Sequence, residues 1–243
     1  MFEPVGQSPA YRRVCEVIRG RILSRDLPEG AVLPTETELA RQFEVNRSTV
    51  REALRQLQSN GLVGRRRGGK RLVVTRPTKE AVAGGFSQAL ALHEARVMDV
   101  CEALLAVEPG IAAAAARQRG DATVQRLRAA AQRFTGAGGD SAEAVGAVAE
   151  FFDALAAGSG NPVFVLLNEP LMGLLQPGLA DIIDRVPQAR RRIGMAQQQI
   201  LQAVAAADAD AAAAWMSRHV QDFRRGYEVA GLPLAAAVGH GPG

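Results

Sequence analysis

The stretch "EVNRSTVREALRQLQSNGLVGRRRGGKRLVV", residues 44–74, combines a helical pattern with a run of positive charge. Asn46 is a residue type that caps helix starts. The apolar residues Val50, Leu54 and Leu57 then recur at the spacing of one helix face. Gly61 is a typical helix stop. The runs "LVGRRR" and "KRLVVT" follow, separated by Gly68-Gly69, and this composition is typical of a two-stranded hairpin.

The residues before this stretch add two more predicted helices. Ser8-Pro9 is a helix start, and apolar residues at helical spacing predict a first helix over about 9–25. Thr35 and Glu38 have the spacing of a capping box, which predicts a short helix ending near Phe43. Three helices followed by a hairpin predict a winged helix-turn-helix domain over residues 1–77.

The charged residues fit DNA binding within that order of elements. The first turn of the third helix carries Arg47, Ser48, Thr49 and Arg51, whose side chains reach base edges and phosphates when such a helix enters the major groove. Glycines at the hairpin tip allow close approach, and the adjacent basic residues attract phosphate. A basic helix face alone is often only a solvated surface. The combination favours a nucleic-acid interface.

Composition limits the remaining possibilities. The chain has 243 residues and 47% hydrophobic content, which suits a globular protein with a sizeable core. We find no apolar run near the roughly 20 residues that span a bilayer and no apolar signal segment, so we expect a cytoplasmic protein with no membrane partner. Cys15 and Cys101 lie at apolar positions of helical patterns, which favours buried structural thiols.

Charge is distributed unevenly along the chain. Residues 1–80 contain 16 Lys and Arg against 9 Asp and Glu, a net charge of +7. Residues 81–243 contain 13 against 16, a net charge of −3. This segregation predicts a basic module for a polyanion and a second module with another task.

Residues 33–63, "LPTETELARQFEVNRSTVREALRQLQSNGLV", resemble the N-terminal domain of the GntR family of bacterial transcription regulators. The resemblance implies that the recognition helix and the wing tip contact operator DNA. Thr37 departs from the family pattern, because many relatives carry a DNA-contacting arginine there. The expected DNA-binding residues are Thr35, Thr37, Arg47, Ser48, Thr49, Arg51, Arg55, Arg66, Gly68, Gly69 and Lys70.

The second part of the chain is predicted to be all helical. We expect a linker and helix entry over 78–90, a bundle of six or seven antiparallel helices over 91–231, and a flexible tail over 232–243. One of these helices is expected over 162–175, with Pro170 and Pro177 as interruptions. Ligand sites of helical bundles form between facing helices. The fold class is therefore mostly α, a winged helix-turn-helix domain followed by a helical bundle.

Three segments of this part resemble the FCD effector domain of the FadR subfamily of GntR regulators. They are "VMDVCEALLAVEPGIAAAAA" (97–116), "EFFDALAAGSGNP" (150–162) and "ILQAVAAADADAAAAWMSRHV" (200–220). Many FCD domains hold a divalent metal through one aspartate and three histidines. The matching positions here are Val148, Phe152, Gln197 and His219. A zinc or nickel site needs three or more protein ligands, so we expect neither a metal nor another cofactor.

The same positions predict the character of an effector. Leu104 stands where many FCD domains place an arginine that grips the effector's carboxylate. We therefore expect a pocket lined by Leu104, Val148, Phe152, Gln197 and His219. It would take a less polar effector, such as an acyl or aromatic compound, with Gln197 and His219 at one end. The alternatives are a bundle that has collapsed around Phe152 and binds no ligand, and a metal-dependent carboxylate sensor.

These inferences predict a transcription regulator, and we expect it to be a repressor. It would be a homodimer that binds double-stranded DNA at a palindromic operator and responds to a small-molecule effector. An enzyme is disfavoured, because three scattered histidines form no catalytic grouping, "GSGNP" is no nucleophile elbow and "RRRGGK" is no P-loop. A protein that binds DNA without sequence preference is disfavoured by the polar base-reading residues beside the charge.

Overall fold

The computed structural model describes residues 9–66, 69 and 71–238 of the chain. The chain divides into two compact units, residues 1–81 and 82–243. Each unit has its own cluster of buried apolar side chains.

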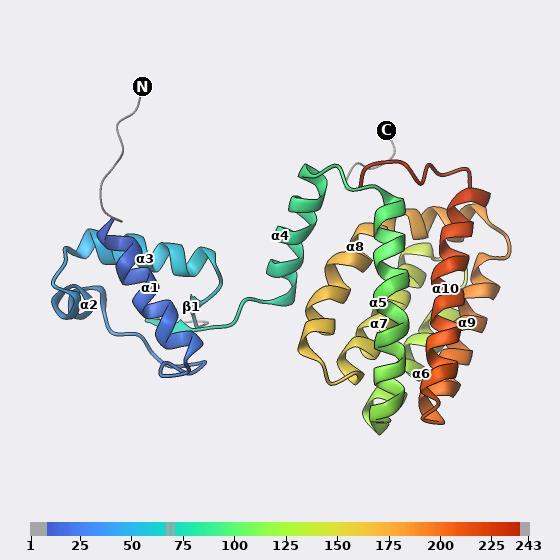
Figure 1. The fold of residues 1–243 in the computed structure, drawn as a ribbon, viewed down its shortest axis with the longest axis horizontal. Helices are drawn as coiled ribbons and strands as arrows, with labels where there is room; N and C mark the ends of the chain where they lie inside the picture. Colours follow the sequence, from blue (N-terminus) through green and yellow to red (C-terminus); the bar gives the residue numbers. More distant parts are fainter. Residues whose placement is uncertain (1–8, 67–68, 70, 239–243) are drawn as a thin grey trace. The chain divides into compact units, whose positions relative to one another are not determined.

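The first unit is a winged helix-turn-helix domain, as predicted. Its elements are the helices α1 (Ala10–Leu23), α2 (Glu36–Phe43) and α3 (Arg47–Ser59) and the strands β1 (Val63–Arg65) and β2 (Leu72–Val74) (Figure 1). The two strands are antiparallel, with Val63 opposite Val74 and Arg65 opposite Leu72. The predicted inward face of α3 is buried: Val50, Leu54 and Leu57 are at most 3% exposed.

The ends of the helices in this unit follow the sequence signals with one exception. The capping box is present, because Glu38 N donates to Thr35 Oγ1 (3.3 Å) and Thr35 N donates to Glu38 Oε2 (2.7 Å). Gly61 has a φ of 69°, the left-handed conformation of a helix stop. Asn46 is the residue before α3, but the prediction that its side chain caps the helix is wrong. Backbone hydrogen bonds fix this turn instead, including Val45 N to Ala40 O (3.0 Å).

The second unit is a helical bundle, as predicted (Figure 1). The helices that the structure describes here are α4 (Lys79–Leu92), α5 (Val97–Gln118), α6 (Asp121–Gly136), α7 (Ser141–Gly158), α8 (Pro162–Arg185), α9 (Ala189–Ala205) and α10 (Ala209–Val229). Helix α5 packs against α10 and α7, α6 packs against α7 and α9, and α8 packs against α7. Aspartate or asparagine side chains cap the starts of α7, α8 and α10.

Helix α8 corrects the prediction of a helix ending near Leu175. It continues through Pro170 and Pro177 to Arg185. Proline removes one backbone donor and disfavours a helix interior. Here the buried face, with Leu171, Leu175 and Leu179 at most 6% exposed, holds the helix together across both prolines. Tertiary packing has overridden the local preference.

The apolar composition of α8 has a second consequence. Its 24 residues reach a mean hydropathy of 1.3 over an 18-residue window, so it is long and apolar enough, by length and composition alone, to cross a membrane. About 33% of that window is buried in the bundle. A core helix passes the same test. Within α8 the apolar sequence is interrupted by Asn168, Glu169, Pro170 and Pro177.

The segment after α10 corrects the prediction of a flexible tail over 232–243. Val97 N donates to Ala236 O (3.0 Å), Met98 N donates to Leu234 O (3.0 Å), and Val238 is 2% exposed. The first N–H groups of a helix have no partner within the helix, and the tail carbonyls supply partners for α5. Residues 239–243 lie outside the described chain.

The segment expected as linker and helix entry, residues 78–90, lies almost wholly within α4. Thr78 precedes this helix, and its Oγ1 accepts a hydrogen bond from Ala81 N (3.3 Å). The division between the two units falls in its first turn, after Ala81.

Candidate DNA-binding surface and effector cavity

The start of α3 presents two arginines that share one carboxylate. Arg51 donates from Nη2 to Glu36 Oε2 (2.8 Å) and from Nε to both carboxylate oxygens (3.2 Å each). Arg47 Nη2 lies 4.0 Å from the same Oε2. Both arginine side chains are more than half exposed, at 61% for Arg47 and 51% for Arg51. Glu36, at the start of α2, therefore orients the Arg51 guanidinium on the surface of α3.

The charges of this cluster are well defined. The hydrogen bonds from Arg51 lower the pKa of Glu36, and those same bonds raise the pKa of Arg51. Glu36 is therefore anionic, and Arg51 is cationic, throughout the physiological range. A DNA phosphate that approaches Arg51 competes with a carboxylate for its donors.

The other predicted contact residues of α2 and α3 differ in their freedom to contact DNA. Thr37 and Ser48 are exposed, and Thr49 is half-buried. The Thr35 hydroxyl already donates to Glu38 Oε2 (2.8 Å), so it serves the helix cap. Arg55 lies 3.7 Å from Glu52 and its side chain is 69% exposed.

An ion pair links the wing to α2. Arg71 Nη2, just before β2, lies 3.7 Å from Glu38 Oε2. Gly69 N donates to Arg66 O (2.8 Å), and a Cβ on Gly69 would lie 3.3 Å from that oxygen, so the turn favours glycine. Arg65 and Arg66 are exposed. Arg67 and the predicted contacts Gly68 and Lys70 lie outside the described residues.

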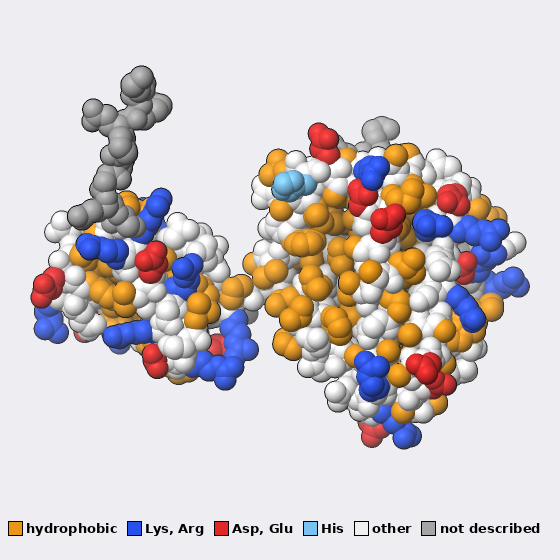
Figure 2. All heavy atoms as spheres, viewed as in Figure 1, with side chains coloured by type: hydrophobic (Ala, Val, Ile, Leu, Met, Phe, Trp, Pro, Cys, Tyr) orange, Lys and Arg blue, Asp and Glu red, His pale blue; other side chains and the backbone are white. Residues whose placement is uncertain are grey.

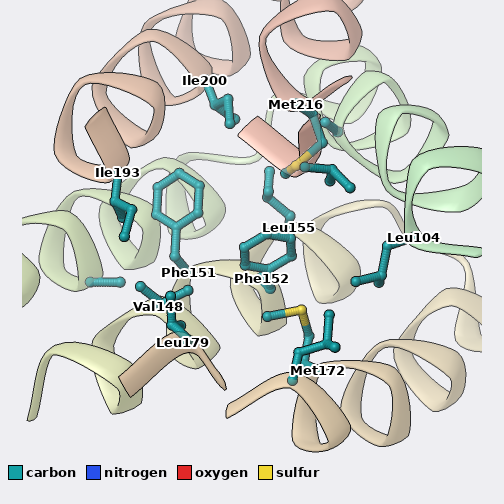
Figure 3. Packing of buried hydrophobic residues seen from close by; sticks show 14 of the residues in the cluster. Leu104, Val148, Phe151, Phe152, Leu155, Met172, Leu179, Ile193, Ile200 and Met216 are labelled. Atoms are coloured by element: carbon teal, nitrogen blue, oxygen red, sulfur yellow. The ribbon is translucent and has the colours of Figure 1, made fainter. Parts of the chain in front are cut away.

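The second unit contains a cavity of about 310 Å³ between α5, α7, α8, α9 and α10. Its buried wall includes Leu104, Val148, Phe152, Met172 and Leu179, and Figure 3 shows these side chains gathered around the Phe152 ring. Four of the five expected pocket residues, Leu104, Val148, Phe152 and His219, line this cavity. The contacts of these residues with an effector stay a prediction.

His219 is part of the apolar wall rather than a charged group. It is 7% exposed, and its ring stacks on Phe152 with the centroids 5.7 Å apart. Burial lowers the pKa of His219 to about 4, against a smaller opposing effect of Asp222. The imidazole is therefore neutral at pH 7.

Gln197, the fifth expected residue, is not among the lining residues. It is fully buried on α9, and neither its amide oxygen nor its nitrogen has a hydrogen-bond partner in the described chain. Glu108 on α5 shares both properties, and burial raises its pKa to about 8. Glu108 was not predicted from the sequence, although its position one turn from Leu104 and Ile111 places a carboxyl on the apolar face of α5.

The mouth of the cavity carries polar residues that the sequence did not indicate. Arg192 on α9 pairs with Asp222 on α10, with Nη1 and Oδ1 3.2 Å apart. Arg225, one turn further along α10, is exposed and also lines the cavity. Arg192 lies 30 residues from Asp222 in the sequence, so only the packing of α9 against α10 brings these two side chains together.

The residues at the family's metal positions do not fit a metal ion. Val148 and Phe152 carry no donor atom, and Gln197 and His219 supply one amide and one imidazole. Within residues 9–66, 69 and 71–238, no group of three or more His, Cys, Asp or Glu residues is placed to hold a metal.

Comparisons with known protein families match both units. Residues 10–73 match the model described as "Bacterial regulatory proteins, gntR family", and residues 99–222, half of the chain, match the FCD domain. The chain belongs to the GntR family and carries an FCD domain. The resemblance stated from the sequence is thereby confirmed in both parts.

Individual relatives agree with this membership. The chain is 27% identical over 221 residues to the HTH-type transcriptional repressor NanR of Citrobacter rodentium, covering 89% of this chain and 85% of that protein. It is 29% identical over 184 residues to NanR of Salmonella bongori, covering 73% and 70%. A solved Streptococcus agalactiae GntR structure superposes with a TM-score of 0.67 at 27% identity, covering 88% of this chain and 99% of that one.

The family and the two sites together define the class of function. A GntR-family chain with an FCD domain is a DNA-binding transcription regulator with an effector-binding domain. The exposed arginines of α3 and the wing lie in the unit that binds DNA in this family. The cavity lies in the unit that binds the effector.

Proposed function

We propose that this GntR-family regulator is a repressor that binds a palindromic operator as a homodimer and leaves it when an effector enters the FCD cavity. The observation that carries the proposal is that two exposed arginines on the first turns of α3, Arg47 and Arg51, pair with the carboxylate of Glu36 on α2. The relatives named as repressors support the direction of control.

We assign the readout of the DNA bases to α3 and the binding of the DNA phosphate backbone to the wing. Bidentate arginine contacts to guanine are the commonest specific contacts in the major groove, and Arg47 and Arg51 are the α3 arginines closest to its N-terminus. Arg65 and Arg66 in the wing lack the polar neighbours of α3 and contribute affinity that depends on salt.

The substitution Arg47→Ala tests this assignment. We expect binding to the operator to weaken by about 1–3 kcal/mol while binding to scrambled DNA changes little, because a base contact is lost. Arg66→Ala is the matched control and should weaken both DNAs together. Fluorescence anisotropy at fixed salt measures both. Undiminished discrimination by the Arg47→Ala protein would refute the readout role.

The effector is proposed to be mainly apolar, and no metal or other cofactor is required. The cavity wall of leucine, valine, methionine and phenylalanine side chains supports this, and its volume of about 310 Å³ speaks against a collapsed bundle. A metal-dependent carboxylate sensor lacks its donor set at Val148 and Phe152.

Dimer formation is supported by an exposed apolar face on the second unit. Figure 2 shows hydrophobic side chains gathered over α4, α5 and α8. Val82, Phe86, Val163 and Leu166 in α4 and α8 are 37–56% exposed. Extended apolar patches on a protein surface mark interaction sites. Light scattering of the purified protein measures the mass that decides this point.

We further propose that the protein acts in the cytoplasm and has no enzymatic activity. Its DNA target lies in that compartment, and the described residues that line the cavity with His219 include no serine, threonine or cysteine that could act as a nucleophile.

A further inference from the structure

The residues lining the effector cavity divide into a buried apolar wall and a more exposed polar mouth. The wall is apolar: Leu104, Val148, Phe152, Leu175 and Leu179 are at most 5% exposed. The polar lining residues other than His219 are half-buried or exposed, and they are Gln176, Gln188, Arg192, Asp222 and Arg225. A ligand that fills the cavity therefore meets hydrocarbon inside and charge at the entrance.

The mouth has an excess of positive charge. It carries two guanidinium groups, those of Arg192 and Arg225, and one carboxylate, that of Asp222. Asp222 pairs with Arg192 (3.2 Å). Arg225 forms no ion pair within the described part of the chain. Its donors are available to form charge-assisted hydrogen bonds with an anionic ligand.

The positive charge continues outside the mouth. An open groove along α10 is lined by Trp215, Arg218, Arg224 and Glu228, and it shares Asp222 and Arg225 with the cavity. The Arg218 guanidinium lies 4.8 Å from the centre of the Trp215 ring. Arginines outnumber carboxylates along this groove, so the approach to the cavity attracts anions.

We propose that the effector is an amphiphilic anion, an aliphatic chain with an anionic head group, whose chain fills the cavity and whose head binds Arg225 at the mouth. This inference rests on the proposed effector function of the cavity and names the ligand class. It places the polar end of the ligand at Arg225 and Arg192, not at the buried Gln197 and His219.

The volume sets the length of the chain. A methylene group occupies about as much space as a water molecule, roughly 30 Å³, so the cavity of about 310 Å³ holds about ten of them. The head group is either a carboxylate or a phosphate monoester, because both are oxyanions that accept paired hydrogen bonds from a guanidinium. Asp222 lies beside the head and is neutralised by Arg192.

Calorimetric titration of the full chain with decanoate, decyl phosphate, decanol and acetate, below micelle-forming concentrations, tests the proposal. We expect both anions to bind, decanol to bind at least tenfold more weakly, and acetate not to bind. The tighter of decanoate and decyl phosphate identifies the head group. Equal affinities of decanoate and decanol, or acetate binding without decanoate binding, would overturn the proposal.

Two matched variants locate the head group. Arg225→Gln should weaken decanoate or decyl phosphate about tenfold and leave decanol unchanged, because only the head loses its partner. Arg224→Gln removes an equal charge from the groove but not from the cavity lining, and should leave both affinities within twofold. Equal losses in the two variants would reduce Arg225 to a general electrostatic effect and refute its role.

A separate measurement keeps this inference distinct from the proposed function. Anisotropy of labelled operator DNA reports regulator binding without any ligand. Intact operator discrimination with no binding of any ten-carbon compound defeats the amphiphile and leaves the DNA-binding function standing. Decanoate binding without release of the operator would support the ligand class and contradict its role as an inducer.

Discussion

Glu36 connects two helices through a single side chain. It belongs to α2, yet its carboxylate accepts three hydrogen bonds from Arg51 and lies 4.0 Å from Arg47 of α3. A carboxylate on a DNA-binding surface has two opposite effects. It repels phosphate, and it restricts the rotamers of the arginine that reads a base.

The substitution Glu36→Gln separates these two effects. We expect binding to scrambled DNA to strengthen, because a negative charge is removed, while binding to the operator weakens a few-fold, because Arg51 loses its orientation. The ratio of the two dissociation constants, measured by anisotropy at one salt concentration, should fall. Glu29→Gln, at a carboxylate that pairs with Arg76, removes the same charge and should preserve the ratio. A preserved ratio in Glu36→Gln would exclude a positioning role.

Two buried titratable groups of the bundle have opposite effects on stability. Burial raises the pKa of Glu108 to about 8, so the folded state keeps a proton that the unfolded state has released above its ordinary pKa near 4.5. Burial lowers the pKa of His219 to about 4, so the unfolded state holds the extra proton between about 4 and 6.5. Raising the pH therefore favours unfolding through Glu108 and folding through His219.

Of these two groups Glu108 has the larger effect between pH 7 and 8, because His219 is mostly neutral in both the folded and the unfolded state there. We expect the free energy of unfolding to fall across this window by up to about 1.4 kcal/mol per pH unit. Glu108→Gln should remove that decline, whereas Glu102→Gln, at an exposed position of the same helix, should retain it. Urea unfolding at several pH values measures the slope. An unchanged slope in Glu108→Gln would assign the pH dependence to other groups.

At the scale of elements, α8 and α10 approach each other through a glycine. A Cβ on Gly178 would lie 1.6 Å from Tyr227 Oη and 2.2 Å from its Cζ, so no larger residue fits without displacing the ring. Gly173, on the same helix, has no atom within 4 Å of its would-be Cβ. The two glycines share a local sequence preference and differ only in tertiary packing.

These two glycines give a matched pair of substitutions. Gly178→Ala should lower the free energy of unfolding by about 1–3 kcal/mol, because the added methyl overpacks the contact with Tyr227. Gly173→Ala should raise it by up to about 1 kcal/mol through helix propensity. Urea denaturation of both proteins measures the difference. Changes of the same sign would show that the helix backbone, not the contact, governs these positions.

The elements also show which features the sequence predicts. The capping box at Thr35 and the stop at Gly61 depend on residues close in sequence, so local chemistry indicates them. The passage of α8 through Pro170 and Pro177 depends on contacts with distant residues, and local chemistry indicates the opposite. The residues of the cavity wall were predicted from the resemblance to the FCD domain, not from local chemistry. Arg192 and Arg225 reach its mouth only through the packing of α9 and α10, which no spacing in the sequence encodes.

At the scale of the whole molecule, the two units have separate cores. Leu57 is fully buried in the first cluster and Leu155 in the second, and the two clusters share no residue. Units with separate cores lose their structure independently unless an interface couples them. The charge of each unit is also separate, positive in the DNA-binding unit and negative in the bundle.

A pair of identical substitutions tests this independence. Leu57→Ala and Leu155→Ala should each destabilise one unit by about 2–5 kcal/mol, because each leaves a cavity in a fully buried site. Scanning calorimetry should show two transitions, with Leu57→Ala lowering the Tm of one and Leu155→Ala that of the other. A single transition that shifts equally in both proteins would show that the units unfold together.

The segment that follows α10 joins the last helix of the bundle to the start of α5. The carbonyls of Leu234 and Ala236 accept hydrogen bonds from the first turn of α5, a few residues after α4 ends. Helix α10 also carries Asp222 and Arg225 at the cavity mouth. Because only a few residues separate the end of α10 from these hydrogen bonds, we expect a shift of α10 along its axis to strain the first turn of α5.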